Sequence, residues 1–207
     1  MIGRAPGSNA KGAGLYRHIE VERDGRRAVV RLARPAARNA LSIALMRELT
    51  AVARGFVDEN EVDVVILTGT DRFFSAGADL RDDERWNTAG KSFVEHREIS
   101  QVGHKMCKAW EEMPQITIAA VEGYAIGGGL ALALACDWRV LAEDAFVTFP
   151  EIRLGFPLTW GTIPRVTALA GPALAKRFVI LCERIAASDA HRFGLVDWLA
   201  SPGGTFE

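Results

Sequence analysis

The chain has 207 residues, 49% hydrophobic and 25% charged, so it is long enough to bury a substantial core as one domain. Its 25 basic and 26 acidic side chains nearly cancel, and no basic block or basic-aromatic alternation suggests a nucleic-acid partner. The three cysteines and four histidines follow no metal-ligand or disulfide spacing, which predicts no metal site and fits a cytoplasmic, reducing location. No apolar run is long enough to predict a membrane span.

The first half of the chain predicts a flexible lead followed by a strand pair, a helix and a strand. Residues 1–14 are rich in Gly, Ala and Ser, and we expect a single domain over 15–207. The dipeptide Asp24-Gly25 predicts a turn between strands over 16–23 and 28–33. Ser42 is placed to cap a helix that carries an apolar stripe to Phe56. A β-branched run then predicts a buried strand over 62–68.

The second half of the chain alternates strands with helices. The polar stretch 81–85 has no regular pattern and suggests a mobile segment, whereas 91–112 predicts a long helix that Pro114 ends. Ser188 is expected to cap a short helix that ends at Gly194. The further strands are expected over 116–121, 138–142, 146–149 and 196–199, and the further helices over 130–136, 161–170 and 172–182. This alternation indicates an α/β fold.

Two glycine-centred segments each follow a β-branched strand: FSAGADL at 74–80 and GYAIGGG at 123–129. Glycine there lets the backbone approach a ligand closely and turn its N–H groups outward. Two such loops, if they converge, could present two donors to one oxygen, as an oxyanion hole does. A tight strand-to-helix turn explains either segment alone. Neither loop carries the Lys-Ser/Thr pair of a P-loop, and Ser75 lies outside a G-x-S-x-G motif, so nucleotide-binding and serine-hydrolase readings fail.

The two loops, the segment RPAARNAL at 34–41, the pair Cys136-Asp137 and the triplet Phe149-Pro150-Glu151 occur in an order and spacing that resemble the crotonase (enoyl-CoA hydratase/isomerase) superfamily. The resemblance runs over about residues 16–199 and implies a ClpP/crotonase-like spiral of repeated strand-strand-helix units. It implies an acyl-CoA substrate whose thioester carbonyl the loops polarise, with coenzyme A entering only as part of that substrate and no other cofactor. It also implies a homotrimer or a dimer of trimers. Family members continue for several tens of residues past the position of Leu199, so we expect the C-terminal helical layer to be missing here.

Matching the family motifs to this chain assigns the site. The amides of Ala78 and Gly128 match the oxyanion donors, and Glu151 matches a catalytic glutamate. The substrate contacts that carry over are Ala37, Arg38, Ala40, Ala76, Gly77, Asp79, Leu80, Gly127 and Ala131. The cluster of Arg31, Arg34 and Arg38 either meets the phosphates of coenzyme A or forms an ordinary solvated turn. Trp86, Phe93 and Trp160 are candidates for the acyl tunnel, with plain core packing as the alternative.

The proton chemistry of the site is where this chain departs from the family pattern. Hydratases of the family carry two glutamates that activate water, and Ala131 occupies the position of the first. The apolar neighbours of Glu151 should raise its pKa towards neutrality, which suits a group that takes and returns a proton; an exposed glutamate at a strand end is the alternative. A lone glutamate beside an oxyanion hole suffices for Δ3,Δ2-enoyl-CoA isomerisation, which we favour. Hydration or hydroxycinnamoyl-CoA-type hydratase-lyase chemistry with one glutamate remains open, as does a non-catalytic acyl-CoA-binding member. Thr159 stands where dehalogenase-type members place an aspartate, which argues against that chemistry.

Overall fold

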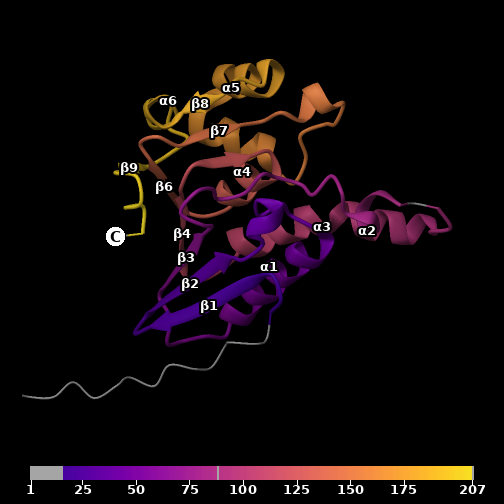
Figure 1. Cartoon of the computed structure of the whole chain (residues 1–207), viewed down its shortest axis with the longest axis horizontal. Coiled ribbons are helices and arrows are strands. Elements are labelled where there is room, and N and C mark those ends of the chain that lie inside the picture. Colours follow the sequence, from indigo (N-terminus) through magenta and orange to yellow (C-terminus); the bar gives the residue numbers. More distant parts are fainter. Residues whose placement is uncertain (1–15, 88, 207) are drawn as a thin grey trace, which may run out of the picture.

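The computed structural model describes residues 16–87 and 89–206, so the expected lead over 1–14 lies outside the described residues. Two sheets organise the chain (Figure 1). The larger sheet has the strand order β1 (Ile19–Asp24), β2 (Arg27–Leu32), β3 (Val64–Thr68), β4 (Ile116–Val121), β6 (Trp138–Ala142) and β9 (Trp198–Ala200). The smaller sheet has the order β5 (Tyr124–Ile126), β7 (Phe146–Thr148) and β8 (Ile185–Ala186).

The register of the larger sheet brings the two glycine segments to the same edge. β1 and β2 pair antiparallel about the expected turn, and every later neighbour in this sheet pairs parallel. Thr68 at the end of β3 lies opposite Ala120 near the end of β4. Because parallel strands present their carboxyl ends at one edge, the segments that follow β3 and β4 begin side by side.

The helices begin largely where the sequence predicts. They are α1 (Ile43–Phe56), α2 (Asp83–Trp86), α3 (Phe93–Glu111), α4 (Gly128–Ala133), α5 (Thr162–Leu181) and α6 (Ala187–Arg192), with 3-10 turns η1 (Pro35–Ala37) and η2 (Glu151–Leu154). The predicted cap is confirmed, since the Leu45 amide donates to the Ser42 hydroxyl over 3.2 Å. The predicted break between two helices is also confirmed, because Gly171 lies at φ 80° inside α5.

The stretch 81–85, which was expected to be mobile, contains the short helix α2, because the Asp82 carboxylate accepts a hydrogen bond from the Glu84 amide and begins a helical turn. Two other local expectations need correction. The helix expected from residue 130 already begins at Gly128. The Ser188 cap is wrong: Ala186 occupies the cap position, two residues earlier, and α6 begins at Ala187.

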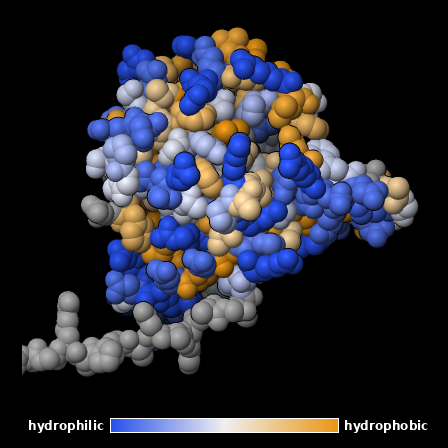
Figure 2. Space-filling model, in the orientation of Figure 1, coloured by the Kyte–Doolittle hydropathy of each residue, from blue (hydrophilic) through white to orange (hydrophobic). Residues whose placement is uncertain are grey.

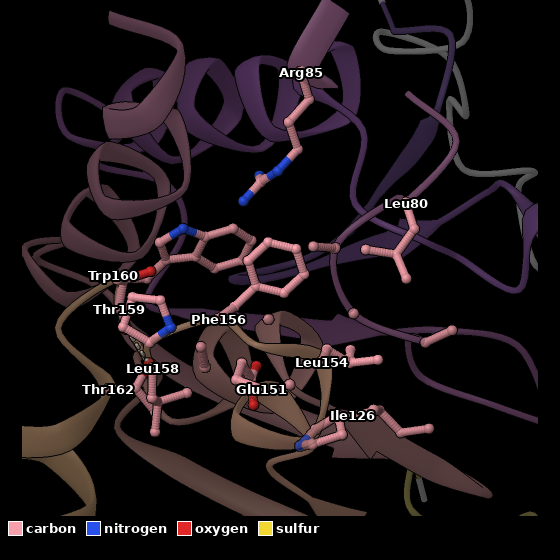
Figure 3. A pocket seen from close by; sticks show the side chains of 18 of the residues that line it. Leu80, Arg85, Ile126, Glu151, Leu154, Phe156, Leu158, Thr159, Trp160 and Thr162 are labelled. Carbon is pink, nitrogen blue, oxygen red and sulfur yellow. Dashed lines mark hydrogen bonds between the residues drawn. The ribbon is translucent and has the colours of Figure 1, made fainter. Parts of the chain in front are cut away.

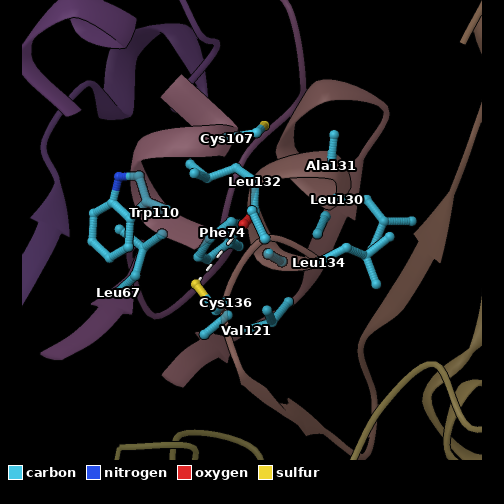
Figure 4. Packing of buried hydrophobic residues seen from close by; sticks show 14 of the residues in the cluster. Leu67, Phe74, Cys107, Trp110, Val121, Leu130, Ala131, Leu132, Leu134 and Cys136 are labelled. Atoms are coloured by element: carbon cyan, nitrogen blue, oxygen red, sulfur yellow. Dashed lines mark hydrogen bonds between the residues drawn. The ribbon is translucent and has the colours of Figure 1, made fainter. Parts of the chain in front are cut away.

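The core lies where α1, α3 and α4 pack with the large sheet, and Figure 4 shows its centre. Leu67 and Val121 from neighbouring strands meet Leu132 of α4 in this cluster. The indole of Trp110 is fully buried and donates to the Leu49 carbonyl over 3.1 Å, so its one polar atom is satisfied. Burial raises the pKa of the Cys136 thiol to about 12, which makes it an inert core residue. Within the described residues, no helix combines the length and apolar character that crossing a bilayer requires.

Candidate active site

The two glycine segments are joined by backbone hydrogen bonds. The Ile126 amide donates to the Ser75 carbonyl over 3.0 Å, and the Phe74 amide donates to the Tyr124 carbonyl over the same distance. These bonds attach β5 to the first segment. Ser75 is buried, and its hydroxyl donates to the Asn39 carbonyl over 2.8 Å. Ser75 is therefore a structural link between segments and not an exposed nucleophile.

The segment 34–41 closes the other side of the first glycine segment. The Leu41 amide donates to the Gly77 carbonyl over 2.7 Å, and the Asp79 amide donates to the Leu41 carbonyl over 3.1 Å. The Ala76 amide donates to the Arg38 carbonyl over 3.0 Å. Hydrogen bonds to the segment 34–41 and to β5 thus fix the backbone around Gly77, so its conformation is set before a ligand binds.

Close backbone packing at this junction requires glycine. Gly77 lies at φ +90°, and a Cβ added there would stand 2.6 Å from the Ile126 carbonyl oxygen and 3.4 Å from the Gly128 nitrogen. No side chain fits between two backbone segments at that separation. The glycine therefore allows the first segment to lie directly against the start of α4.

Two amide groups at this junction remain without a protein acceptor. In the part of the chain that the structure describes, neither the Ala78 amide nor the Gly128 amide donates a hydrogen bond to a backbone or side-chain acceptor. Both residues line one cavity of about 300 Å³. Two unused donors that border one cavity are the arrangement that an oxyanion hole needs.

The cavity is mainly apolar, and Figure 3 shows the side chains that surround it. Side chains of α2 line the cavity on one side, and side chains from the stretch that follows β7 line it on the other. The lining residues are Ala76, Gly77, Ala78, Leu80, Arg85, Trp86, Ser100, Ile126, Gly127, Gly128, Ala131, Pro150, Glu151, Leu154, Phe156, Pro157, Leu158, Thr159, Trp160 and Thr162. Glu151 and Arg85 are the two lining side chains that carry a charge when ionised.

Glu151 is placed in the cavity by the 3-10 turn that begins directly after β7 and Pro150. Its Oε2 atom is buried and has no hydrogen-bond partner in the described part of the chain. Burial raises the pKa of the Glu151 carboxyl above its ordinary value, and the hydrogen bond to its own backbone only partly opposes this effect. A desolvated carboxyl with an unused oxygen is suited to accept a proton from a ligand in the cavity and return it.

Ala131 borders the same cavity but brings no polar group. It is almost fully buried in α4, and its amide donates to the Gly127 carbonyl over 2.8 Å. The methyl group of Ala131 cannot hold or deprotonate water. Glu151 is consequently the single carboxylate among the described lining residues.

The other expected substrate contacts divide into two groups. Ala76, Gly77, Leu80 and Gly127 line the cavity with Ala131. Ala37, Arg38, Ala40 and Asp79 do not belong to the lining, although the backbone around them supports it.

The arginine cluster is only partly available to a ligand. Arg34 and Asp79 form a partly buried ion pair with 3.0 Å between Nη2 and Oδ2. Arg31 donates to the Gly69 carbonyl over 3.0 Å. Arg38 is exposed and has no ion pair among the described residues, so it is the member of the cluster that could meet a phosphate.

Of the three aromatic candidates, Trp86 and Trp160 line the cavity, whereas Phe93 does not and is 81% exposed. The Trp160 indole lies against glycine backbone on two sides. A Cβ on Gly103 would stand 2.0 Å from this ring, and one on Gly128 would stand 2.3 Å from it. Trp160 therefore belongs to the wall of the cavity as well as to the core.

Sequence reasoning missed Asn39, Arg85 and Phe156. Asn39 is fully buried, its side-chain amide donates to the Phe74 carbonyl over 3.0 Å, and its Oδ1 accepts from the Arg34 amide over 2.9 Å. It also lies at φ 52°, a conformation that asparagine tolerates better than most residues. Its place in the segment 34–41 was a weak signal for this role, and the apolar surroundings of Glu151 in the sequence include Phe156; no sequence pattern marks Arg85 as a cavity residue.

The chain is similar to known proteins over most of its length. A family model described as "Enoyl-CoA hydratase/isomerase" matches residues 23–202. The chain is 34% identical over 186 residues to the short-chain-enoyl-CoA hydratase of Clostridium acetobutylicum, covering 89% of this chain and 69% of that protein. It is 35% identical over 188 residues to the crotonyl-CoA hydratase of Syntrophomonas wolfei, covering 90% and 70%. The crystal structure of an enoyl-CoA hydratase from Bacillus anthracis superposes with a TM-score of 0.82 at 33% identity, covering 90% of this chain and 71% of that one.

Proposed function

The chain belongs to the enoyl-CoA hydratase/isomerase family, which confirms the crotonase resemblance, and from this premise we propose that it acts on an enoyl-CoA thioester through a stabilised enolate. Three groups would do the chemistry: the amides of Ala78 and Gly128 and the carboxylate of Glu151. The observation that carries the proposal is that these groups border one cavity in which Glu151 is the single carboxylate of the described lining.

The two amides would bind the thioester oxygen. When a proton leaves C2, negative charge moves onto that oxygen, and two preorganised N–H groups stabilise the enolate more than the neutral thioester. One donor of this kind contributes about 3–4 kcal/mol to the transition state. That both amides lack protein acceptors among the described residues supports this role, because no internal bond has to break first.

Glu151 would carry the proton. For Δ3,Δ2-enoyl-CoA isomerisation, the carboxylate takes a proton from C2, the double bond moves from C3 to C2 through the enolate, and the carboxylic acid returns the proton to C4. No water is added and no group leaves. We favour this reaction because Ala131 brings no second carboxylate to hold water and because the lining around Glu151 is apolar.

Hydration is the second candidate, and the relatives favour it: all three proteins compared above carry the name of a hydratase. Here Glu151 alone would take a proton from water as the hydroxyl adds to C3, and the proton would then be delivered to C2. The hydratase-lyase variant would use the same single carboxylate.

Proton NMR of a 3-enoyl-CoA in heavy water distinguishes these reactions. Isomerisation through Glu151 predicts a shifted double bond with deuterium at C4 and no new hydroxyl. Hydration adds water across a double bond at C2, so the matching 2-enoyl-CoA is measured in parallel. A 3-hydroxyacyl product from the 2-enoyl-CoA, with the 3-enoyl-CoA unchanged, would replace the isomerase assignment by a hydratase one. Binding of both isomers without reaction of either would identify a non-catalytic acyl-CoA-binding protein.

The remaining proposals concern binding and assembly. We propose that Ala37, Arg38 and Ala40 line the pantetheine and nucleotide of coenzyme A, which predicts that Arg38→Met weakens binding of free coenzyme A. Assembly as a homotrimer or a dimer of trimers is a proposal from the family alone, and sedimentation equilibrium tests it.

A further inference from the structure

A positive charge reaches into the apolar cavity from the side opposite the catalytic carboxylate. Figure 3 shows the Arg85 side chain extending from α2 towards Trp160 and Phe156, with Glu151 on the far side of these aromatic rings. Burial is the main cause of the raised pKa of Glu151. Arg85 requires an explanation of its own.

Two acidic residues beside Arg85 are engaged elsewhere, and a third, Asp83, is exposed and outside the cavity lining. Asp82 accepts hydrogen bonds from the amides of Ile43 and Glu84 over 2.6 and 3.1 Å. Glu84 forms an ion pair with Arg47 at 2.7 Å. Across residues 16–87 and 89–206, the Arg85 guanidinium has no side-chain hydrogen bond and no ion pair.

Aromatic rings hold the guanidinium at the cavity. Its central carbon lies 5.1 Å from the ring centroid of Trp86 and 5.5 Å from that of Trp160. Burial lowers the pKa of Arg85, and the charge of Asp82 only partly opposes this effect, but an arginine stays protonated in proteins. Stacking on aromatic faces offsets part of the desolvation cost and satisfies none of the five N–H donors. The position is thus a preorganised cationic subsite whose complement is a planar anion.

We propose that Arg85 receives a carboxylate at the distal end of the acyl group, so that the preferred substrates are thioesters of dicarboxylic acids. This inference rests on the proposed function in one respect: the cavity must hold the acyl group, with the thioester at Ala78 and Gly128. A methyl-ended chain would leave the guanidinium unmatched, whereas a carboxylate would accept two parallel N–H bonds from its planar fork. The rest of the lining between the two ends is apolar, as a hydrocarbon chain requires.

Binding measurements test this inference without depending on turnover. Isothermal titration would compare saturated acyl-CoA thioesters of equal chain length that end in methyl or in carboxylate, over a series of increasing length. At the best-fitting length we expect the carboxylate-ended thioester to bind about 10- to 100-fold more tightly, the range for hydrogen bonds to charged groups. Equal affinity of the two thioesters in the wild-type protein at every length would overturn the inference.

Variants identify the residue responsible. Arg85→Met should abolish the preference, and Arg85→Lys should retain part of it because the charge remains while the planar fork is lost. Arg81→Met is the matched control, since Arg81 is exposed on the same segment and lies outside the cavity; it should keep the full preference. If Arg85→Met weakened free coenzyme A and both thioesters equally, Arg85 would be a phosphate ligand and the inference would be wrong.

The same thioesters separate the two proposals. Selective binding of the carboxylate-ended compound with no reaction of either its 3-enoyl or its 2-enoyl form would support this inference and contradict the proposed function. Reaction of both 3-enoyl forms with equal kcat/KM and equal affinity would support the proposed function and overturn this inference.

Discussion

The carboxylate of Glu151 lies directly against the backbone of Gly127. A Cβ added to Gly127 would stand 2.5 Å from Oε1 of Glu151, a separation that no real pair of such atoms adopts. The missing side chain at Gly127 therefore makes room for the carboxylate beside the start of α4. Gly127 follows β5 and Glu151 follows β7, and these two strands pair parallel, so the small sheet holds the two residues together.

Replacing Gly127 with alanine should displace the carboxylate. Gly127 also lies at φ +50°, so the substitution adds backbone strain of about 1–3 kcal/mol. We expect kcat to fall by about 10²-fold or more because the proton carrier is moved. Gly25→Ala is the control: Gly25 has a similar φ of +58° with nothing within 4 Å of an added Cβ. It should show the strain in urea unfolding but keep kcat, and equal kcat losses in both variants would contradict the steric explanation.

Glu151→Gln should remove proton transfer while preserving the shape of the site. We expect kcat to fall by about 10²–10⁴-fold with little change in the dissociation constant of a saturated acyl-CoA. Turnover by rapid quench and affinity by titration measure the two effects. Unchanged turnover in the variant would exclude Glu151 as the base.

Because the pKa of Glu151 is raised, increasing pH should raise the activity of the enzyme and lower the contribution of Glu151 to its stability. The base form appears only as pH rises through a pKa above the ordinary carboxyl value, so kcat/KM should rise along a limb displaced to higher pH. The folded state binds this proton more tightly than the unfolded chain does. The stability that Glu151 contributes is therefore present below the unfolded pKa and lost as pH rises through the folded one.

Comparison with Glu151→Gln isolates this contribution. The free energy of unfolding of the wild type, relative to the variant, should decrease from acidic to neutral pH. A difference that is constant over this range would show that burial does not perturb the carboxyl.

Ala131→Glu should introduce hydration if a second carboxylate is what the site lacks. The new side chain would enter the cavity from α4, where it could hold water near the bound double bond. Ala131→Gln has nearly the same size without the charge and serves as the control. A 3-hydroxyacyl product that increases in the glutamate variant alone supports this explanation, and the absence of any increase opposes it.

Asp79→Asn should loosen the first glycine segment. Asp79 and Arg34 join this segment to 34–41 through side chains that are 13% and 20% exposed. Loss of one charge leaves the other partly buried without its partner, which should lower the free energy of unfolding by about 1–3 kcal/mol. Asp63→Asn removes the charge partner of Arg26 in an exposed ion pair and should lower the free energy of unfolding much less, because water and salt screen exposed charges. Similar losses in both variants would show that burial of the Arg34–Asp79 pair is unimportant.

Local sequence signals account for most of the elements. The turn at Asp24-Gly25, the Ser42 cap and the break at Gly171 each depend on the conformational preference or hydrogen bond of a residue and its near neighbours, and all three are present. The capping of α6 was mispredicted because Ser188 is a good cap in isolation, while the chain already turns at Ala186 where β8 ends.

The sequence by itself determined the α/β class and the two glycine segments, because periodicity indicates the first and contiguous motifs indicate the second. Glu151 was selected by the family resemblance, through the triplet Phe149-Pro150-Glu151. Only the tertiary structure decided which distant side chains share the cavity. In the structure, Arg34 pairs with Asp79 and Phe93 is exposed. The Arg85 guanidinium lies near the rings of Trp86 and Trp160. These outcomes depend on how α2 and the stretch after β7 pack across the cavity (Figure 3). Hydropathy alone does not mark the site on the face that Figure 2 shows, because hydrophilic and hydrophobic residues are interspersed there. Contacts between segments far apart in the chain depend on the packing of the whole domain, which no local pattern encodes.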